Sequence, residues 1–538
     1  MGKFWHRTLV KGFQVSLAIL ILGLGACATI EKPEPTSLAD ATRELGRTGL
    51  QGLAALDHLG LARESAVAQM VELKAADFIE VEGYGLVIGL MDKGSPAPPE
   101  PLRGELSKEL IRLDYDREIV PVMLESLDTA VVRVWGRIPP AAPEGLLFDC
   151  FVEALSPSVD LTGGYLLKTN LAWGLKEAGG YVQTKATAVG PVGAGGFDYK
   201  AVRSGSGIVH QGVILGGGTV SDTRILYLHL KEPDSNLAVG LSLLINSRFP
   251  YRAAALSDQE IMLGVPPEYL DDWKHFTAVV GKRAPWMLDE EGLSGMLDKI
   301  YEAFIDAGGD EVKQIALFLE AIGSPAAGHL RAALRLPDRE VRYQAAKALA
   351  FIRDQSANEV LFEFASSAAP ARRVEATRLL GKVGGASSIP LLARLLESNS
   401  YQVRWEAMQA LEALNDKTYI RAYKMRHLKL LAVRSEIEEV ILVNQEGLPT
   451  IMLFGENIQV TPPAAVEVRE GRVNLLFEED AATVYFWKGA ERKKLKLSLR
   501  VEDMVDLLLT LELSFYDIVK VLEDLSNAGA LKAQVVFI

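Results

Sequence analysis

The stretch Val341-Arg342-Tyr343-Gln344-Ala345-Ala346-Lys347-Ala348-Leu349 decides the architecture of this chain, because related copies of it occur twice more. The copies are Arg372-Arg373-x-x-Ala376-x-x-Leu379-Leu380 and Val403-Arg404-x-x-Ala407-x-x-Ala410-Leu411, each 31 residues after the one before. A preceding apolar segment keeps the same spacing through Leu330, Leu361 and Leu392. Helix pairs at constant spacing bury their apolar stripes against neighbouring pairs, so the pattern predicts a stacked helical solenoid.

This block resembles a short form of the HEAT-type helical repeats, and Leu317-Phe318 marks a degenerate first copy. The resemblance implies a concave surface that binds a protein partner of unknown identity. The repeated Arg342, Arg373 and Arg404 leave two interpretations open. They form an anion-binding ladder, or each arginine braces the neighbouring repeat, which the regular position within the repeat favours.

The composition describes a folded protein of several domains with an acidic surface. The chain has 538 residues, of which 49% are hydrophobic and 24% charged, close to the globular average and too long for one core. Its formal net charge of −13 argues against nucleic acid as a partner, because phosphate binding needs a basic surface. Two cysteines are too few for a disulfide scaffold or a four-thiolate metal site.

The first thirty residues indicate the compartment. Lys3, Arg7 and Lys11 precede an apolar run over residues 15–24, and Leu24-Gly25-Ala26-Cys27 follows. This order resembles a bacterial lipobox, which implies removal of residues 1–26 and acylation of Cys27. An uncleaved membrane anchor is the alternative, since residues 12–30 carry no charge. We expect a lipid-anchored protein on the periplasmic side of the cell envelope, and Ala28 favours the outer membrane.

Two β-rich blocks flank the repeats. Between residues 77 and 248 apolar and polar residues alternate, as in Leu226-Tyr227-Leu228-His229-Leu230, and Asp234 or Ser235 caps a helix near the end of this block. Strands are predicted again at 440–443, 450–454, 473–477, 483–487 and 495–499. A helix capped by Ser514 with Asp517 then leads to a stop at Gly529 and a last strand over 533–538. The predicted fold class is α+β, with a β-rich core in two segments interrupted by the solenoid.

Both blocks carry motifs that resemble the bacterial flagellar P-ring protein family. The first block has Val81-Glu82-Gly83-Tyr84-Gly85-Leu86-Val87-Ile88-Gly89-Leu90, then Gly163-Gly164-x-Leu166 and Thr169-x-Leu171, and a helix entered through Pro233-Asp234. The end of the chain has Asp517-Ile518-Val519-x-Val521-Leu522 and Ala528-Gly529-Ala530-Leu531-x-Ala533-Gln534-Val535-Val536. The resemblance covers roughly residues 77–275 and 437–538, so the HEAT-type repeats are interpreted as an insertion into one ancestral fold.

Five regions follow from the resemblance and the repeat. They are a signal peptide over 1–26, a lipidated tether with an N-terminal helical segment over 27–76, a P-ring-like part over 77–300, HEAT-like repeats over 301–436, and a second P-ring-like part over 437–538.

The resemblance implies a structural subunit of a flagellar ring and no enzymatic activity. It implies self-association into a ring around the flagellar rod, contact with other basal-body ring proteins, and a membrane attachment through the N-terminal lipid. The alternative is a non-flagellar envelope lipoprotein that uses its repeats as an adaptor. An enzyme such as a peptidoglycan hydrolase is a third class, and no residue pattern supports it.

Three sequence features that could suggest a chemical site are better interpreted as structural. Gly83-x-Gly85-x-x-x-Gly89 is followed by Pro96, which forbids the helix a dinucleotide loop needs, so packing glycines are predicted. Cys150 alternates with Phe148 and Val152, which predicts a buried, inert thiol. Gly216-Gly217-Gly218 predicts a hairpin tip. No catalytic, cofactor or metal site is predicted, and Cys27 is the only modified residue.

Overall fold

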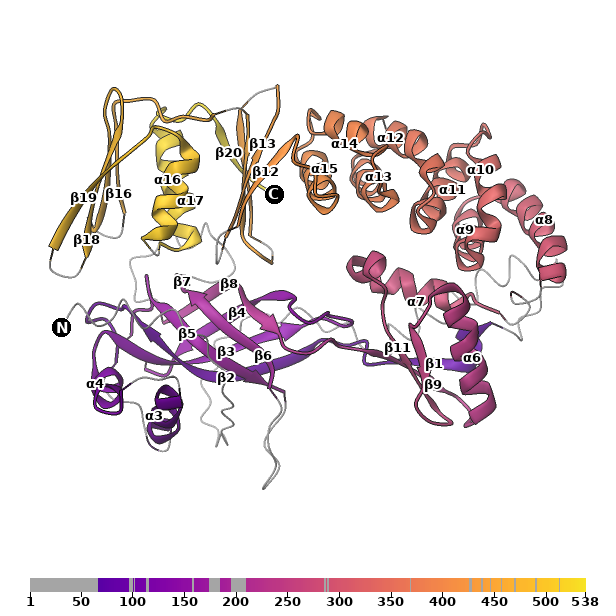
Figure 1. The fold of residues 1–538 in the computed structure, drawn as a ribbon, viewed down its shortest axis with the longest axis horizontal. Coiled ribbons are helices and arrows are strands. Elements are labelled where there is room, and N and C mark those ends of the chain that lie inside the picture. The colour runs from indigo at the N-terminus through magenta and orange to yellow at the C-terminus, as the bar shows by residue number, and fades with distance from the viewer. Residues whose placement is uncertain are drawn as a thin grey trace.

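The computed structural model describes residues 66–538 apart from short internal segments (Figure 1). The segments left out are 96–99, 101, 113–115, 157–158, 174–183, 195–209, 285–286, 288–289, 368, 425–427, 437–438, 446, 456, 469–470, 489–490 and 512. The predicted signal peptide, lipobox and Cys27 therefore lie outside the described residues.

The first β-rich unit is a closed barrel of antiparallel strands. The strands are β2 (Ile79–Ile88), β3 (Thr129–Ile138), β4 (Leu147–Ala154), β5 (Tyr165–Ala172), β6 (Thr184–Pro191) and β8 (Gln211–Val220). They pair in the order β4-β3-β2-β5-β6-β8, and β8 pairs with β4 to close the ring. The short strand β7 (Gly193–Ala194) pairs with β8 at the rim. Alternate residues such as Val81, Val132, Cys150 and Val152 fill the interior.

Glycines let the barrel strands approach one another closely. A Cβ on Gly83 would lie 2.2 Å from the Asn170 carbonyl oxygen, and one on Gly85 would lie 2.2 Å from the Thr169 hydroxyl oxygen. The prediction of packing glycines is confirmed at these two positions. The helices α3 (Leu102–Arg112) and α4 (Ile119–Glu125) pack on the outside of β2 and β3.

The prediction of a hairpin tip at Gly216-Gly217-Gly218 is wrong. These residues lie within strand β8, where the β4 to β8 register shifts between Phe148 and Cys150. A Cβ on Gly218 would lie 2.6 Å from the Phe148 ring, and Gly216 has φ of +57°. The glycines therefore bend a strand over a large side chain instead of ending it.

A smaller sheet follows the barrel. Its strands are β1 (Val71–Lys74), β9 (Leu226–Leu230), β11 (Glu260–Leu263) and β10 (Ala253–Ala255), in that order. The helices of this unit are α2 (Val67–Met70), α6 (Ser235–Arg248) and α7 (Trp273–Gly281), with the 3₁₀ helix η3 (Pro267–Asp272) before α7. Asp234 caps α6 by accepting from the backbone N–H groups of Asn236 and Leu237, as its sequence predicts.

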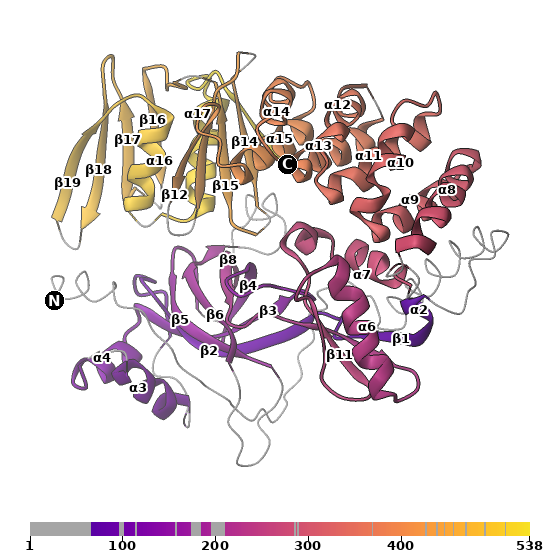
Figure 2. The same cartoon turned by 45° about the vertical axis from the view of Figure 1, so that its right-hand side comes forward.

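Stacked helix pairs form the solenoid (Figures 1 and 2). The pairs are α8 (Glu290–Asp306) with α9 (Asp310–Ile322), α10 (Ala327–Ala333) with α11 (Arg339–Ile352), α12 (Asn358–Ser367) with α13 (Pro370–Val383), and α14 (Ile389–Leu395) with α15 (Tyr401–Ala413). Equivalent repeat positions are equally buried, because Ala345, Ala376 and Ala407 are all 0% exposed. Phe318 in α9 is also buried, which fits the predicted degenerate first copy.

The helical region is shorter than the predicted 301–436. It begins at Glu290 and ends at Ala413, and the strands β12 (Ile420–Lys424) and β13 (Lys429–Val433) lie within the predicted range. The apolar run over 428–433 is too short for a repeat helix, and β13 pairs with β12 and with the strand over residues 450–454.

The C-terminal module is two sheets with helices between them (Figure 1). One sheet has the order β12-β13-β15-β14-β20, with β14 (Val440–Asn444), β15 (Thr450–Phe454) and β20 (Gln534–Phe537). The other has the order β16-β17-β18-β19, with β16 (Ala464–Val468), β17 (Val473–Phe477), β18 (Ala482–Lys488) and β19 (Glu491–Leu497). The helices α16 (Val501–Thr510) and α17 (Phe515–Asn527) share an apolar core with both sheets. The predicted capping box of Ser514 and Asp517 is present.

One face of the β12 to β20 sheet packs against the end of the solenoid, and the other packs against α16 and α17. Leu431, Leu442 and Met452 belong to the apolar cluster that runs through the solenoid to the first small sheet. Leu430, Ile441 and Leu453, on the alternate positions, belong to the cluster of the C-terminal module. The solenoid is therefore joined by continuous packing to the units before and after it.

Candidate functional site

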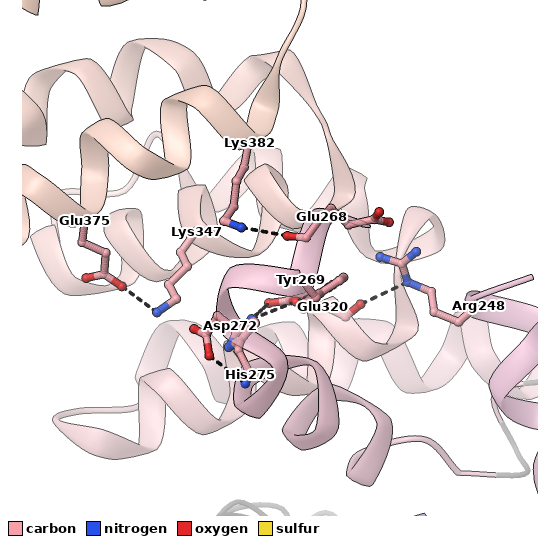
Figure 3. A network of polar contacts seen from close by, with 9 residues as sticks. All are labelled: Arg248, Glu268, Tyr269, Asp272, His275, Glu320, Lys347, Glu375 and Lys382. Atoms are coloured by element: carbon pink, nitrogen blue, oxygen red, sulfur yellow. Dashed lines mark hydrogen bonds and ion pairs between the residues drawn. The ribbon is translucent and has the colours of Figure 1, made fainter. Parts of the chain in front are cut away.

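The solenoid is fixed to the small β-sheet unit by a buried polar cluster (Figure 3). Glu320, near the end of α9, has a side chain that is 2% exposed. The Tyr269 hydroxyl donates to Glu320 Oε1 at 2.9 Å, and His275 Nε2 lies 2.9 Å from both carboxylate oxygens. Asp272 accepts from the His275 backbone N–H at 3.0 Å and so holds the start of α7. The pKa of the Tyr269 hydroxyl is raised, mainly by burial, so the hydroxyl stays protonated and acts as a hydrogen-bond donor.

Aromatic rings and the Arg283 side chain complete this junction. Phe351 of α11 stacks on Tyr269 with ring centroids 4.8 Å apart and on His275 at 4.3 Å. Arg283 is 3% exposed and donates to the carbonyl oxygens of Ala321 and Leu244, each at 2.9 Å. It thereby joins the C-terminal ends of α9 and α6, where a cation interacts favourably with the helix dipole. Burial lowers the pKa of Arg283 to about 10, so it remains charged at neutral pH.

A cleft of about 610 Å³ lies where η3 meets the solenoid's inner helices α13 and α15. Lys382 bridges its two walls by donating to the Glu268 carbonyl oxygen at 2.7 Å and to Asp271 Oδ1 at 2.5 Å. The Glu268 contact is drawn in Figure 3. Arg378 and Glu406 pair at 2.5 Å on the opposite side. The small residues Gly381 and Ala410 also line the cleft and pack closely together, since a Cβ on Gly381 would lie 2.5 Å from the Ala410 Cβ.

A second cleft, of about 370 Å³, lies further along the same concave side, between α9, α11, α13 and His275. Glu375 accepts from Lys347 Nζ and from the Tyr343 hydroxyl, both at 2.7 Å. Burial alone would raise the pKa of Glu375, but the Lys347 ammonium and the hydrogen bonds lower it below its usual range. Arg372 pairs with Glu340 at 2.9 Å and lies over the Tyr343 ring. The concave side therefore carries alternating charges that are already paired across neighbouring helices.

The repeated arginines help to join adjacent structural units. Arg342 of α11 forms an ion pair with Glu363 of α12, in the next repeat. Arg404 of α15 lies over the Phe454 ring of β15, with its Cζ 5.8 Å from the ring centroid. The bracing interpretation is confirmed for Arg342, whereas Arg404 packs on the C-terminal module instead of a neighbouring repeat.

The C-terminal module touches the rim of the barrel. A Cβ on Gly193 of β7 would lie 2.1 Å from Cε2 of Tyr516, so the ring of α17 lies directly on this backbone. The Gly216 backbone of β8 also lies close to Gly447, since a Cβ there would lie 2.8 Å from the Gly447 carbonyl oxygen. Asp149 accepts from the Gly216 N–H at 2.7 Å. The pKa of the Tyr516 hydroxyl is raised, mainly by burial and secondly by the nearby negative charge of Asp149. The two β-rich parts thus build separate sheets and meet through an interface.

The described residues contain no group of three or more His, Cys, Asp or Glu placed to hold a metal ion. Cys150 is a free, fully buried thiol whose pKa burial raises, which confirms its prediction as a buried residue. His329 pairs with Asp298 at 2.9 Å, away from His275. Among the helices that the structure describes, none is long and apolar enough to cross a bilayer.

Sequence reasoning missed the junction residues Tyr269, His275, Glu320 and Lys382. His275 and Glu320 lie 45 positions apart, and Lys382 and Asp271 lie 111 apart, on elements with no shared pattern. The only available signal was Glu320 within the apolar end of a repeat helix, where a carboxylate needs a buried partner.

The fold and these surfaces define a class of protein, an α+β scaffold whose modules are joined by a helical-repeat solenoid with a charged concave side. Comparison with known proteins gives the family relationship. The family model described as "Flagellar P-ring protein" matches residues 66–284, and the model described as "HEAT repeats" matches residues 327–412. The resemblance predicted from the sequence is thereby confirmed for these two regions, whereas the resemblance of residues 437–538 stays a prediction.

Curated relatives agree with the first match. A flagellar P-ring protein of Thermotoga petrophila is 32% identical over 209 residues, which are 37% of this chain and 60% of the relative. One of Caulobacter vibrioides is 30% identical over 243 residues, which are 42% of this chain and 63% of the relative. The chain thus spans about three fifths of the length of the curated relatives it matches. A solved phycocyanin lyase complex from Nostoc sp. aligns at a TM-score of 0.20, with 25% identity over 27% of this chain and 60% of that chain, which adds nothing to the assignment.

Proposed function

We propose that this protein is a structural subunit of a ring in the bacterial flagellar basal body. The observation that carries the proposal is the extent of the family match, residues 66–284. These residues comprise the whole barrel and the small β-sheet unit, and the match ends just before α8 begins at Glu290. The matched residues therefore form intact structural units, and the solenoid is attached to them through Glu320 and Arg283.

A ring subunit needs rigidity and two different contact surfaces, because identical copies placed head to tail close a ring through heterologous interfaces. Interfaces between its modules supply the rigidity. Tyr516 and Gly447 of the C-terminal module lie against the barrel rim at Gly193 and Gly216. The acidic groups of the concave side are paired with lysine, arginine, tyrosine or histidine, which suits a structural role better than proton transfer.

In this proposal the ring surrounds the flagellar rod and contacts other basal-body ring proteins. Acylation of Cys27 holds each subunit to the envelope on its periplasmic side, with the outer membrane favoured by Ala28. Mass spectrometry of the protein purified from its own bacterium tests the anchor. Acyl chains on Cys27 and loss of residues 1–26 are expected, and an intact N-terminal segment would refute it.

The solenoid is proposed to bind a further protein along its concave side. The cleft of about 610 Å³ beside η3 is bordered by paired charges and small side chains, which suits an extended polar segment of a partner. Ala413→Arg places a large side chain at this cleft from an exposed position of α15. Ala332→Arg is the matched control on an exposed position of α10, outside that cleft.

The ring proposal is tested by deleting the gene and restoring it with each variant. Deletion is expected to abolish motility and to leave basal bodies without this ring. The wild-type chain and Ala332→Arg restore both, whereas Ala413→Arg restores the ring but loses one accompanying protein from purified basal bodies. Normal motility and complete basal bodies in the deletion strain would overturn the ring role.

Normal motility and complete basal bodies in the deletion strain are expected if the protein is instead an envelope adaptor without a flagellar role, which is the second candidate function. The solenoid favours it, since helical repeats of this kind supply binding surfaces in proteins of many functions. If the protein is an adaptor, Ala413→Arg should still disrupt binding to its protein partner, and motility should be unchanged in every strain.

A further inference from the structure

We propose that the outer face of the β18–β19 hairpin is a binding site for an anionic phospholipid surface. The site consists of Tyr485, Trp487, Arg492, Lys494 and Lys496, and is called the basic hairpin face below. It lies at the end of the C-terminal module away from the solenoid (Figure 1). The proposal concerns a membrane contact separate from Cys27 and does not depend on the ring role.

The strand register places these side chains on one face. Arg492 lies opposite Trp487, Lys494 opposite Tyr485, and Lys496 opposite Thr483. The alternate positions of β18 belong to the core, since Val484 is 0% exposed and packs in the cluster with α16 and α17. Because successive side chains of a strand point to opposite faces, the three cations share the face turned away from α16 and α17.

Every residue from Glu491 to Lys496 is exposed, and β19 is the last strand of its sheet. Residues on the same face of a strand are about 7 Å apart, so the cations form a regular row along the sheet edge. Four of these six residues are basic and one is acidic, in a chain whose formal net charge is −13. Glu491 pairs with Lys493 at 2.7 Å, on the other face of the strand from Arg492, Lys494 and Lys496. The row is therefore a local reversal of the protein's overall charge.

Aromatic residues accompany the charges. Arg492 Cζ lies 4.5 Å and Lys494 Nζ 5.4 Å from the centroid of the Tyr485 ring. Trp487 is 52% exposed although it is a large apolar residue. Tryptophan and tyrosine with lysine and arginine are the side chains that concentrate at the boundary between a bilayer and water. Each basic residue close to an anionic surface adds to the attraction.

Protection of an exposed sheet edge is the alternative explanation of the lysines. Charged residues on edge strands prevent pairing with other chains. This explanation accounts for Lys494 and Lys496 but not for the exposed Trp487 on the same face, opposite Arg492, since an exposed aromatic side chain favours association. A membrane surface accounts for both the charge and the aromatic residue.

The test compares binding of the full chain to vesicles of phosphatidylcholine alone and of phosphatidylcholine with phosphatidylglycerol. Any contribution of the N-terminal apolar segment is the same in every variant, so the ratio of the two affinities isolates the effect of lipid charge. The triple variant Arg492→Ser, Lys494→Ser, Lys496→Ser is compared with Arg335→Ser, Lys417→Ser, Lys532→Ser. The control residues are also exposed and remove the same charge.

The wild-type chain and the control are expected to prefer the anionic vesicles by about tenfold or more at low salt. The preference is expected to be at least about tenfold weaker in the hairpin triple variant than in the control, since both keep Lys3, Arg7 and Lys11 at the N-terminus. It disappears for all proteins in about 1 M salt, where the screening length is about 3 Å. Trp487→Ala keeps the salt dependence and weakens binding to the anionic vesicles.

Three results would overturn the proposal. They are equal preferences for the hairpin variant and the control, no preference for anionic lipid in the wild-type chain, and full competition by inorganic phosphate at the same phosphorus concentration. The last result would identify a free-anion site. Matching circular dichroism melting curves show that the variants are folded, and reduced amide exchange in β19 on anionic vesicles measures the same contact in the unaltered chain.

Discussion

Replacing Glu320 by alanine should loosen the junction between the solenoid and the P-ring-like part. The substitution leaves the Tyr269 hydroxyl, on a side chain that is 0% exposed, without its acceptor, and it removes both oxygens that face His275. An orphaned buried hydroxyl costs about 1–3 kcal/mol, and losing a hydrogen bond to a carboxylate costs about 1.5–3 kcal/mol, so a loss of about 3 kcal/mol or more is expected in all. The junction should therefore open at least a hundredfold more often, since about 1.4 kcal/mol is a factor of ten.

Amide hydrogen exchange of the full chain is the suitable assay, because a single free energy of unfolding is not defined for several coupled modules. Exchange in α7 and at the end of α9 reports local opening of the junction. The barrel strands β2 and β3 serve as an internal reference. In Glu320→Ala we expect exchange to rise about a hundredfold or more in α7 and α9 and to stay unchanged in β2 and β3.

Two variants sharpen the interpretation. Glu320→Gln keeps an oxygen that can accept from Tyr269, so it should have a smaller effect than Glu320→Ala. Glu359→Ala removes an exposed carboxylate from α12 and should leave exchange in α7 unchanged. An increase of less than about threefold in α7 for Glu320→Ala would refute the reasoning, because it corresponds to less than about 0.7 kcal/mol.

Three other changes test separate parts of the structure. Gly193→Ala should raise amide exchange in α17 and β8, because the new methyl group clashes with the Tyr516 ring. Adding Tyr516→Ala removes that ring and should reduce the effect. Exchange in Gly193→Ala at the wild-type rate would contradict the contact. Burial lowers the pKa of Lys282 from 10.5 to about 8. Between these two pH values the folded state binds fewer protons than the unfolded state, so local stability rises with pH by up to about 3 kcal/mol. Amide exchange in α7 from pH 8 to 10.5, corrected for the intrinsic rate, should show this gain in the wild type and in the control Lys274→Met, but not in Lys282→Met. The same gain in Lys282→Met would refute the assignment to Lys282. Ser514→Ala removes the capping box of α17 and should destabilise that helix by about 1 kcal/mol, seen as about fivefold faster exchange in its first turns; no change would show that the cap is dispensable.

The sequence predicted those parts of the fold that have a period. The repeat of 31 residues located the solenoid, and its buried positions Ala345, Ala376 and Ala407 behave alike in the structure. The strands at 450–454 and 473–477 have the predicted bounds, because their residues alternate or form a short apolar run between turns. The caps at Asp234 and Ser514 were also predictable, since capping depends on residues close in sequence.

The parts that failed depend on contacts between distant residues. Strand β19 begins at Glu491, earlier than the predicted 495, because its exposed charged residues hide the alternation. The Gly216-Gly217-Gly218 stretch has the composition of a turn, yet Phe148 of the neighbouring strand determines that it stays within β8. The junction of Tyr269, His275 and Glu320 has no local pattern at all, so only the three-dimensional structure brings it together.

Cryo-electron microscopy of basal bodies isolated from the bacterium that encodes this chain tests the central proposal most directly. We expect a cyclic ring around the rod in which each subunit shows the barrel, the C-terminal module against its rim, and the helical solenoid fixed at α7 and α9. Basal bodies that are complete and contain no copy of this chain would contradict it.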